Sequence, residues 1–440
     1  MGLHRELLDA GQLKEKMDSL RDRKGDLNRK IADAKKSGGD TDELIANQKA
    51  VSSEIKVLQK ALKKQLNAGG EPKRWAPEAP RAPSPILDKD RVGPIEVVDA
   101  FHRKDSLADA DEYVRAHPAG SIWHTTGISQ FIENTYGHRS RYLCALDANR
   151  GVVGVLPLVQ MKSRIFGNFV VSVPYFNYGG VLADHRAIAD ALFERAIAWR
   201  DEIGAGHLEM RHCFNIGFHF PQRTDKVTFW LPLPESSEDL WSSFPPKVRA
   251  QIRRGERETE EVAFGGKELL DQFYRVFARN MRDLGTPVYG KEFFANLLNE
   301  LGSSANLVVI RKNSQPIGCA FIAGQGARLE IPWASTLREH NHTGVNMLMY
   351  WRILDFAVAT GYQIFDFGRC SADAGTYRFK QQWGAISVPL NWDYLLEGDG
   401  AELPQLNPNN PKFRLLIATW KRLPVWLSRL IGPMVVKYLP

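Results

Sequence analysis

The sequence contains few cysteines and no long run of apolar residues. Its four cysteines, among 440 residues, lie far apart with no paired spacing, which excludes a disulfide framework and a structural zinc site. The histidines also lack a recognisable ligand spacing, so we expect no metal ion and no other cofactor. The longest apolar runs, such as residues 151–159 and 169–175, are far shorter than the roughly 20 residues that cross a bilayer. Because no signal segment opens the chain, these absences predict a cytoplasmic protein with reduced thiols.

The overall composition is that of a globular protein, with 43% hydrophobic, 10% aromatic and 25% charged residues. Such a chain can bury a core, and its length suits two or three domains at about 150 residues each. Its 58 lysines and arginines outnumber 51 acidic residues, which gives a net charge of +7. This excess favours anionic partners such as nucleic acid, phosphorylated substrates or membrane lipid.

Residues 1–68 are predicted to form an antiparallel coiled-coil helical hairpin. Apolar residues recur at the spacing of a coiled-coil seam, and Gly38 and Gly39 interrupt the pattern, which divides it into two helices. The first helix carries basic side chains toward this tip: Arg21, Lys24, Arg29, Lys30, Lys35 and Lys36. Prolines then recur through residues 69–94, which we interpret as a linker.

The body of the chain repeats one order of α/β elements, which indicates two related domains, residues 95–235 and 236–397. The first has expected strands at 141–146 and 152–159, a helix at 184–203, and a strand at 207–211 that ends in arginine. The second has expected strands at 306–311 and 316–323, a helix at 345–360, and a strand at 362–367 followed by Gly368 and Arg369. A basic helix that begins near residue 246 separates the two domains in sequence.

Several short motifs in the body resemble the FemAB family of aminoacyltransferases. They are residues 121–125 (SIWHT), 134–138 (NTYGH), 173–175 (VPY), 178–180 (YGG), 284–288 (LGTPV), 365–369 (FDFGR), 379–384 (FKQQWG) and 420–424 (WKRLP). The similarity is greatest to the branch associated with exosortase and exopolysaccharide gene clusters. It implies two tandem GNAT-like (acyl-CoA N-acyltransferase-like) domains and transfer of an amino acid from aminoacyl-tRNA to an amine.

The resemblance also implies catalytic roles. In the family an aromatic-lysine pair lies at the donor ester, and Phe379 and Lys380 match it. Aminolysis of an ester builds negative charge on the carbonyl oxygen, and a fixed cation there contributes about 3 kcal/mol or more; the alternative is that Lys380 is a surface lysine beside a core aromatic residue. Asp366 either assists proton removal or forms a salt bridge with Arg369. The candidate substrate-binding residues are Lys247, Arg253, Arg254, Tyr289, Arg369 and Trp383.

The N-terminal hairpin resembles the tRNA-binding arm of seryl-tRNA synthetase. Residues 28–32 (NRKIA) and 34–40 (AKKSGGD) follow that arm, including the basic residues before a Gly-Asp tip. The resemblance implies that the hairpin binds tRNA and, more narrowly, tRNA for serine, because basic side chains along such an arm can follow a phosphate backbone. A coiled coil that dimerises the protein or binds a partner is the alternative.

Together these features predict an aminoacyl-tRNA-dependent transferase that forms an amide on an amino group of a cell-envelope or exopolysaccharide precursor. An acyl-CoA-dependent N-acyltransferase is an alternative, although residues 341–346 (NHTGVN) keep only one glycine of the CoA-binding pattern. A non-catalytic tRNA-binding or scaffold protein is another. The basic amphipathic segment at 398–440 either lies on the inner face of the membrane, through residues 412–440, or packs on the body.

Overall fold

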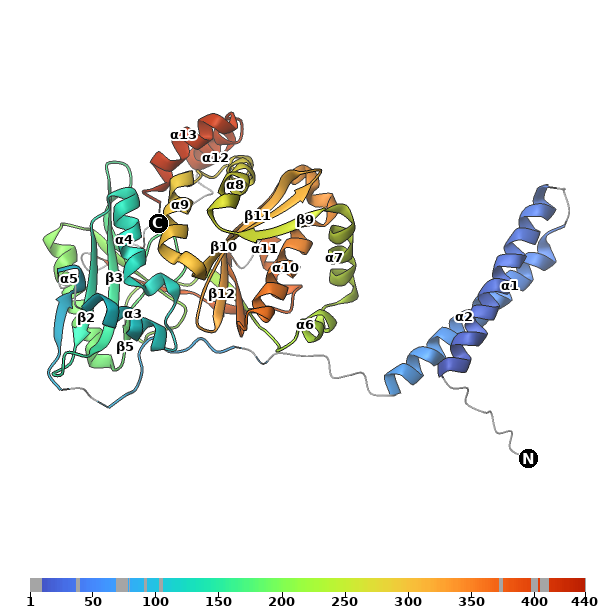
Figure 1. Cartoon of the computed structure of the whole chain (residues 1–440), viewed down its shortest axis with the longest axis horizontal. Helices are drawn as coiled ribbons and strands as arrows, with labels where there is room; N and C mark the ends of the chain where they lie inside the picture. Colours follow the sequence, from blue (N-terminus) through green and yellow to red (C-terminus); the bar gives the residue numbers. More distant parts are fainter. Residues whose placement is uncertain are drawn as a thin grey trace. The chain divides into compact units, whose positions relative to one another are not determined.

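The computed structural model describes residues 10–36, 40–68, 78, 80–90, 93–102, 106–371, 375–396, 403 and 411–439. The chain forms two compact units, Met1–Ala76 and Pro77–Pro440 (Figure 1). The first is a pair of helices, α1 (Ala10–Lys36) and α2 (Asp42–Ala68). The second holds two β-sheets with helices on their faces. The predicted mixed α/β fold, preceded by a helical hairpin, is therefore confirmed.

An apolar seam holds the two helices of the first unit together. Leu20 on α1 forms a cluster with Val51 and Ile55 on α2, and Asn28 accepts a hydrogen bond from Gln48 at 2.6 Å. From the first of these contacts to the second, the residue number rises on α1 and falls on α2. The two helices are therefore antiparallel. The predicted break at Gly38 and Gly39 lies outside the described residues.

The first sheet has the strand order β1-β2-β3-β4-β6-β15-β7, with β5 paired to β3. Its strands are β1 (Glu96–Asp99), β2 (Ser140–Leu146), β3 (Val152–Ser163), β4 (Gly167–Val171), β5 (Leu182–Ala183), β6 (His207–His212), β7 (Gln222–Arg223) and β15 (Asn391–Leu396). The helices of this part are α3 (Ser106–Ala116), α4 (Thr126–Tyr136) and α5 (Arg186–Glu202), with 3-10 turns η1 (Ala100–His102) and η2 (Ile122–His124). Residues 84–89 run beside β5, because Leu87 donates its N–H to the Ala183 carbonyl at 2.8 Å.

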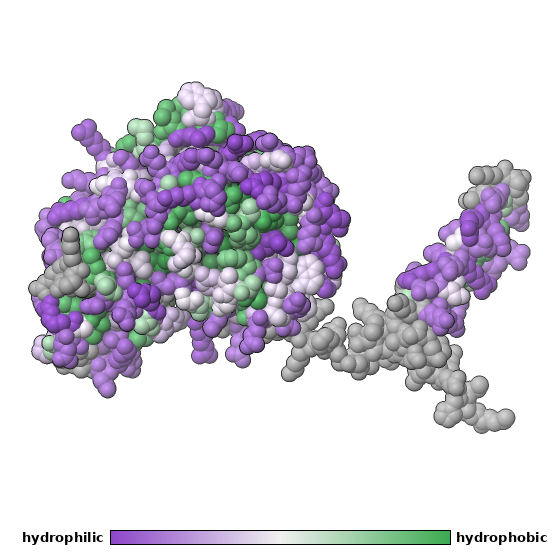
Figure 2. Space-filling model, in the orientation of Figure 1, coloured by the Kyte–Doolittle hydropathy of each residue, from purple (hydrophilic) through white to green (hydrophobic). Residues whose placement is uncertain are grey.

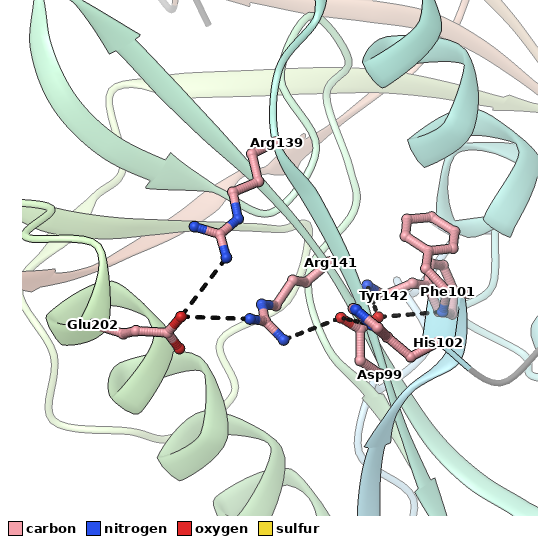
Figure 3. Close-up of polar contacts among 7 residues, drawn as sticks. All are labelled: Asp99, Phe101, His102, Arg139, Arg141, Tyr142 and Glu202. Atoms are coloured by element: carbon pink, nitrogen blue, oxygen red, sulfur yellow. Dashed lines mark hydrogen bonds and ion pairs between the residues drawn. The ribbon is translucent and has the colours of Figure 1, made fainter.

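Charged side chains tie the edge of this sheet to α5 (Figure 3). The Arg141 guanidinium lies 3.2 Å from the Asp99 carboxylate and 3.6 Å from that of Glu202. The Asp99 carboxylate also accepts the Phe101 N–H at 3.2 Å. Arg141 therefore joins β2 to both the end of β1 and the last turn of α5.

The second sheet has the strand order β14-β8-β13-β12-β11-β10-β9. Its strands are β8 (Lys226–Pro232), β9 (Glu261–Gly265), β10 (Ala305–Lys312), β11 (Gln315–Gln325), β12 (Arg328–Thr336), β13 (Ile364–Ser371) and β14 (Ile386–Pro389). Its helices are α6 (Ser237–Ser243), α7 (Pro246–Glu258), α8 (Leu270–Leu284), α9 (Lys291–Leu301), α10 (Val345–Ala359) and α11 (Gly375–Gln381), with 3-10 turns η3 (Lys267–Leu269), η4 (Gly302–Ser304) and η5 (Arg338–Thr343). Helices α12 (Pro411–Trp420) and α13 (Val425–Val436) follow.

The two sheets are linked by two chain crossings and share a core. The chain passes from β7 in the first sheet to β8 in the second, and returns from β14 in the second to β15 in the first. One apolar cluster includes residues of both parts, and Phe131 of α4 packs edge-on against Phe293 of α9 with ring centres 5.1 Å apart. Burial of this shared apolar surface stabilises the two domains as one body.

Candidate functional site

Each sheet contains one parallel strand pair that diverges along its length. In the first sheet β4 pairs with β6 only at Val170 with Leu208 and Val171 with Glu209. In the second, β12 pairs with β13 only from Arg328 to Glu330. Beyond these positions no further ladder pairs join the strands in the described part of the chain, so each sheet opens at one place.

The first opening is filled by the protein's own backbone. Residues 172–180 cross it, and the N–H groups of Gly179 and Gly180 donate to the Arg211 carbonyl at 3.2 and 3.0 Å. The Arg211 side chain is 1% exposed; it donates to the Glu209 carboxylate and to the Phe176 carbonyl, each at 2.7 Å. Arg211 is therefore a buried structural cation.

The second opening carries an extra residue in β13. Asp366 lies opposite Trp230, whereas Arg369 lies opposite Thr228, so three steps on β13 match two on β8. The extra residue forms a bulge, and Gly368 adopts a φ of 71° there, a conformation that glycine takes without strain. Because Trp230 and Thr228 are two residues apart, the bulge keeps Asp366 and Arg369 on one face of the sheet.

Asp366 is fully buried and its carboxylate is occupied by donors. It accepts hydrogen bonds from Thr228 at 2.7 Å, Trp230 at 2.9 Å and the Gly368 N–H at 2.8 Å, and a further one from the Tyr178 hydroxyl. No ion pair with Arg369 occurs among the described residues. The geometry therefore favours a positioning role for Asp366, which holds the bulge and the first domain's Tyr178, over either role expected from the sequence.

Glu330, the β12 partner of Asp366, is a second buried carboxyl group at this point. It accepts hydrogen bonds from Trp123 of the first domain at 2.5 Å and from Asn177 at 2.9 Å. Burial, together with the negative charge of Asp366, raises the pKa of Glu330 to about 8. The two carboxyl groups and their donors from the first domain form a polar junction between the domains.

Arg369 extends from the bulge to an exposed position. Its guanidinium lies 5.1 Å from the ring centre of Trp392, and that of Arg211 lies 4.3 Å from the same ring. Protein atoms that displace water, together with the charge of Arg211, lower the pKa of Arg369 to about 10. Burial raises the pKa of Tyr289 to about 12, although both arginines oppose this shift. We refer to Arg211, Arg369, Tyr289 and Trp392 as the arginine cluster.

Lys380 lies behind the same bulge. It is 6% exposed, and its Nζ donates to the carbonyls of Gly368 at 2.5 Å and Arg369 at 3.0 Å. Burial lowers the pKa of Lys380 below its usual value. The third N–H of the ammonium has no acceptor among the described residues. Lys380 is therefore a buried cation that supports the carbonyls of the bulge, and is not a surface lysine.

The neighbours of Lys380 are aromatic. Phe379 meets Tyr350 edge-on, with ring centres 4.9 Å apart. Trp383 is buried beside Phe244, with ring centres 5.2 Å apart. Phe379 therefore packs α11 against α10, whereas Trp383 packs on the segment between α6 and α7 and offers no exposed surface to a substrate.

Helix α7 lies away from this junction. Figure 1 shows it on the side of the second sheet remote from the first domain, and its Gly255 packs against Leu348 of α10. Lys247, Arg253 and Arg254 are exposed on this helix. The structure thus brings Asp366, Arg369, Lys380 and Tyr289 together, and leaves the three basic residues of α7 elsewhere.

Sequence reasoning missed several residues of this junction. Arg211, Trp392 and Glu330 were not candidates, and neither were Trp123 and Tyr178 individually. One signal for Arg211 was present, because the repeat places an arginine at the ends of both equivalent strands. Trp392 and Glu330 carry no such signal, because only the folded chain brings them to the bulge.

Two general features of the described residues bear on function. No group of three or more histidine, cysteine, aspartate or glutamate side chains there could hold a metal ion. Likewise, none of the helices in these ranges has the length and apolar character needed to span a bilayer.

Comparison with known proteins shows what the chain resembles. Residues 246–381 match the family described as acetyltransferase (GNAT) domain. The crystal structure of FemX is similar at a TM-score of 0.52, with 14% identity over 64% of this chain and 95% of that one. A tandem GNAT protein from the clavulanic acid biosynthesis pathway is similar at a TM-score of 0.46, with 11% identity over 70% of this chain and 100% of that one. L-PGS from Bacillus licheniformis is similar at a TM-score of 0.42, with 10% identity over 70% of this chain and 97% of that one.

No curated protein matches the sequence. The chain therefore carries a GNAT acyltransferase domain within a FemX-like fold, and the predicted tandem GNAT-like architecture is confirmed. These findings support an acyltransferase.

Proposed function

We propose that this chain transfers an aminoacyl group from aminoacyl-tRNA to an amino group of a cell-envelope or exopolysaccharide precursor. The observation that carries the proposal is the second strand divergence, where the exposed Arg369 and the buried Lys380 flank one bulge. The resemblance of the sequence motifs to FemAB transferases supports the choice of donor. The resemblance of the hairpin to a tRNA-binding arm supports it independently.

The start of α10 argues against CoA as the donor. Acetyltransferases hold the CoA pyrophosphate at a helix N-terminus, and Gly344 precedes α10 at the corresponding place. A Cβ on Gly344 would lie 2.7 Å from the Gln251 carbonyl of α7, and one on Gly255 would lie 2.7 Å from Cβ of Leu348. Helix α7 therefore packs directly on the residues that would bind the pyrophosphate.

The equivalent start of α5 in the first domain is also covered. His185 caps this helix by accepting the Ala187 N–H at 3.1 Å. Lys89 lies 2.9 Å from the Asp184 carboxylate and donates its own N–H to the Asp184 carbonyl. The Lys89–Asp184 pair therefore covers this end of the helix, and neither α5 nor α10 presents an open anion site at its N-terminus.

The chemistry of the proposed reaction needs positive charge at one oxygen. The amine nitrogen attacks the ester carbonyl, a C–N bond forms, the C–O bond to the tRNA ribose breaks, and a proton passes from nitrogen to the leaving oxygen. Negative charge accumulates on the carbonyl oxygen meanwhile, and a positioned cation stabilises it. Lys380, through its remaining N–H, and Arg369 are the cations we assign to this task, with Phe379 and Tyr289 beside them.

The basic side chains of α1 suit an RNA backbone. Arg21 and Lys30 pair with Asp18 at 2.7 Å and Asp26 at 3.0 Å on the exposed surface of the helix. Such exposed pairs contribute little stability, so these cations can exchange their partners for phosphates. Arg29 and Lys24 belong to the same helix, whereas the side chains of Lys35 and Lys36 lie outside the described residues. Serine tRNA is the donor we propose on the likeness of this arm.

The decisive experiment is purification of the protein with its bound RNA under conditions that preserve the ester. Sequencing that RNA and identifying its amino acid by mass spectrometry should reveal charged tRNA, with serine as the expected amino acid. Transfer of the labelled amino acid to an amine acceptor in a cell extract that retains its membranes would establish catalysis. Stabilisation by CoA against heating, without bound tRNA, would favour the acyl-CoA alternative. Bound tRNA without transfer would favour a scaffold.

A further inference from the structure

The two C-terminal helices are docked on the body through one side only. A Cβ on Gly432 of α13 would lie 2.8 Å from the Val288 backbone, and Arg282 of α8 donates to the Leu423 carbonyl at 2.7 Å. Ser428 and Val436 of α13 are buried on the same side. The segment therefore packs on the body, as one of the two expectations had it, and its opposite side remains uncovered.

That opposite side is apolar. Trp426, Leu430 and Met434 are 66%, 64% and 66% exposed, and their spacing of four places them in one stripe along α13. Figure 2 shows apolar side chains gathered over the α12 and α13 region at the top of the view. A contiguous exposed apolar stripe on a helix that is already docked indicates a second binding partner.

A hairpin from the first domain continues this surface. Ile165, in the turn between β3 and β4, is 85% exposed. Residues 162–168 of the hairpin and Met434, Val435 and Tyr438 at the end of α13 line one open recess of about 680 Å³. We refer to the α13 stripe, Ile165 and this recess as the apolar face.

The two segments that form the apolar face carry charge of one sign. Residues 411–440 and 160–168 contain no aspartate or glutamate, and they contribute basic residues on both sides of the stripe. The exposed ones are Lys162, Arg164, Lys421, Arg422 and Arg429. None of these five forms an ion pair within the described parts of the chain. Arg429 lies 5.0 Å from the centre of the Tyr274 ring and acts on the charge of Asp271, whereas the charge of the other four is available to an anionic partner.

We propose that the apolar face binds the surface of an anionic phospholipid bilayer. An apolar helix face with basic flanks lies at the boundary of headgroups and acyl chains, and each basic residue near an anionic leaflet adds attraction. The sequence pointed only to residues 412–440, whereas the structure adds the β3–β4 hairpin as a second contact. A protein partner would have to match both the stripe and an unpaired basic rim, so charge complementarity favours the membrane.

The apolar face is also connected to the arginine cluster. The Lys437 carbonyl after α13 accepts a hydrogen bond from Tyr175 at 2.7 Å, and the Tyr175 ring lies 5.9 Å from that of Tyr289. A bound bilayer would therefore lie beside the proposed transfer site.

The test is flotation of the full chain with vesicles of phosphatidylcholine alone or mixed with phosphatidylglycerol. Wild type should float with the mixed vesicles, less at high salt, and not with phosphatidylcholine alone. Trp426→Ser combined with Leu430→Ser and Met434→Ser should lower the partition coefficient at least tenfold. Val57→Ser on α2, whose side chain is equally exposed at 64%, is the matched control and should bind as wild type.

A second measurement identifies the inserted residue without a multiple variant. Lipids brominated in their acyl chains should quench part of the tryptophan fluorescence of wild type, and Trp426→Phe should remove that quenching while binding persists. Combined Arg164→Gln and Arg422→Gln should reduce the dependence on anionic lipid.

Undiminished binding of the triple variant, or absence of wild-type binding to mixed vesicles, would overturn the proposal. A wild-type dimer that the triple variant converts to monomer, without vesicle binding, would assign the apolar face to self-association. None of these outcomes depends on transfer activity, so failure of this proposal is separable from failure of the proposed function.

Discussion

The two strand divergences begin from nearly the same sequence and end in different structures. One reads Glu209-Met210-Arg211 and the other Asp366-Phe367-Gly368-Arg369, a carboxylate and an arginine in both cases, with one added glycine in the second. Without the added residue, Arg211 reaches back to Glu209 and is buried. With it, Arg369 passes beyond Asp366 and becomes exposed. The one inserted residue thus makes the difference between a buried structural arginine and an exposed arginine that a substrate can reach.

The carboxyl groups of the two sites differ accordingly. Burial raises the pKa of Glu209, but the charge of Arg211 and hydrogen bonds from Tyr394 and Arg211 outweigh it, so this pKa is lowered overall. Glu330 forms no ion pair within the described residues, and burial and the charge of Asp366 raise its pKa to about 8, although the charge of Arg328 opposes the shift. The first site is a satisfied ion pair, whereas at the second the Glu330 carboxyl group keeps its proton near neutral pH beside the charges of Asp366 and Arg328.

The largest effect is expected from the buried arginine. Arg211→Met leaves Glu209 without its cation in the interior, which should reduce the free energy of unfolding by about 3–5 kcal/mol. Arg369→Met should change it by less than about 0.5 kcal/mol but slow aminoacyl transfer about a hundredfold. Urea unfolding of both variants measures the contrast. Equal destabilisation would show that the added glycine does not separate their roles.

Lys380 tests whether the second divergence is the reaction site. Lys380→Met keeps the length of the side chain and loses its charge, so we expect transfer to slow about a hundredfold, or about 2.7 kcal/mol. The affinity for tRNA should change by less than about 1 kcal/mol. Single-turnover transfer and a binding titration measure the two quantities.

Arg378→Met, an exposed change on the same helix, is the control for Lys380. Loss of two carbonyl contacts also predicts a stability loss of about 1–3 kcal/mol, so rates should be measured below the melting transition. Wild-type transfer there would limit Lys380 to supporting the bulge, and a loss mainly of tRNA affinity would make it a donor-binding residue.

The N-terminal hairpin is expected to affect binding of the tRNA donor and not the chemical step at the second divergence. Deletion of residues 1–70 should leave the second compact unit folded and weaken tRNA binding at least tenfold, or about 1.4 kcal/mol. At saturating tRNA the chemical step should be unchanged. Gel-shift titration at matched salt measures the affinity, and an unchanged value together with loss of dimerisation would assign the hairpin to self-association.

The last expected effect is a dependence of stability on pH. Folded Glu330 keeps its proton up to about pH 8, whereas a glutamate in the unfolded chain releases its proton near pH 4.3. Between these values the folded state binds more protons, so this group makes stability fall as pH rises. Glu330→Gln should therefore gain thermal stability relative to wild type as pH rises from 5 to 8, by at most about 1.4 kcal/mol for each pH unit. A difference between the two that stays constant with pH would show that Glu330 is ionised throughout.

Much of the fold followed from sequence pattern. The expected helix at 345–360 is α10, Val345–Ala359, and the expected strand at 207–211 is β6, His207–His212, because apolar periodicity and a glycine stop determine such elements locally. The arginine cluster could not be predicted in this way. Trp392 reaches the first sheet only after the chain has left it at β7 and passed through the second sheet, and Gly368 forms a bulge only because β8 lies beside it. Pairing between distant strands carries no local signature.

The exchange of strands has a consequence for motion. Only residues 224 and 225 connect β7 to β8, and only Leu390, which is fully buried, connects β14 to β15. Because these two short crossings lie side by side, rotation of the domains about one is blocked by the other. The domains therefore cannot open without breaking strand pairs. Under the proposed function, substrates would reach Arg369 across a fixed junction, and we expect turnover to depend on side-chain rearrangement there instead of on domain closure.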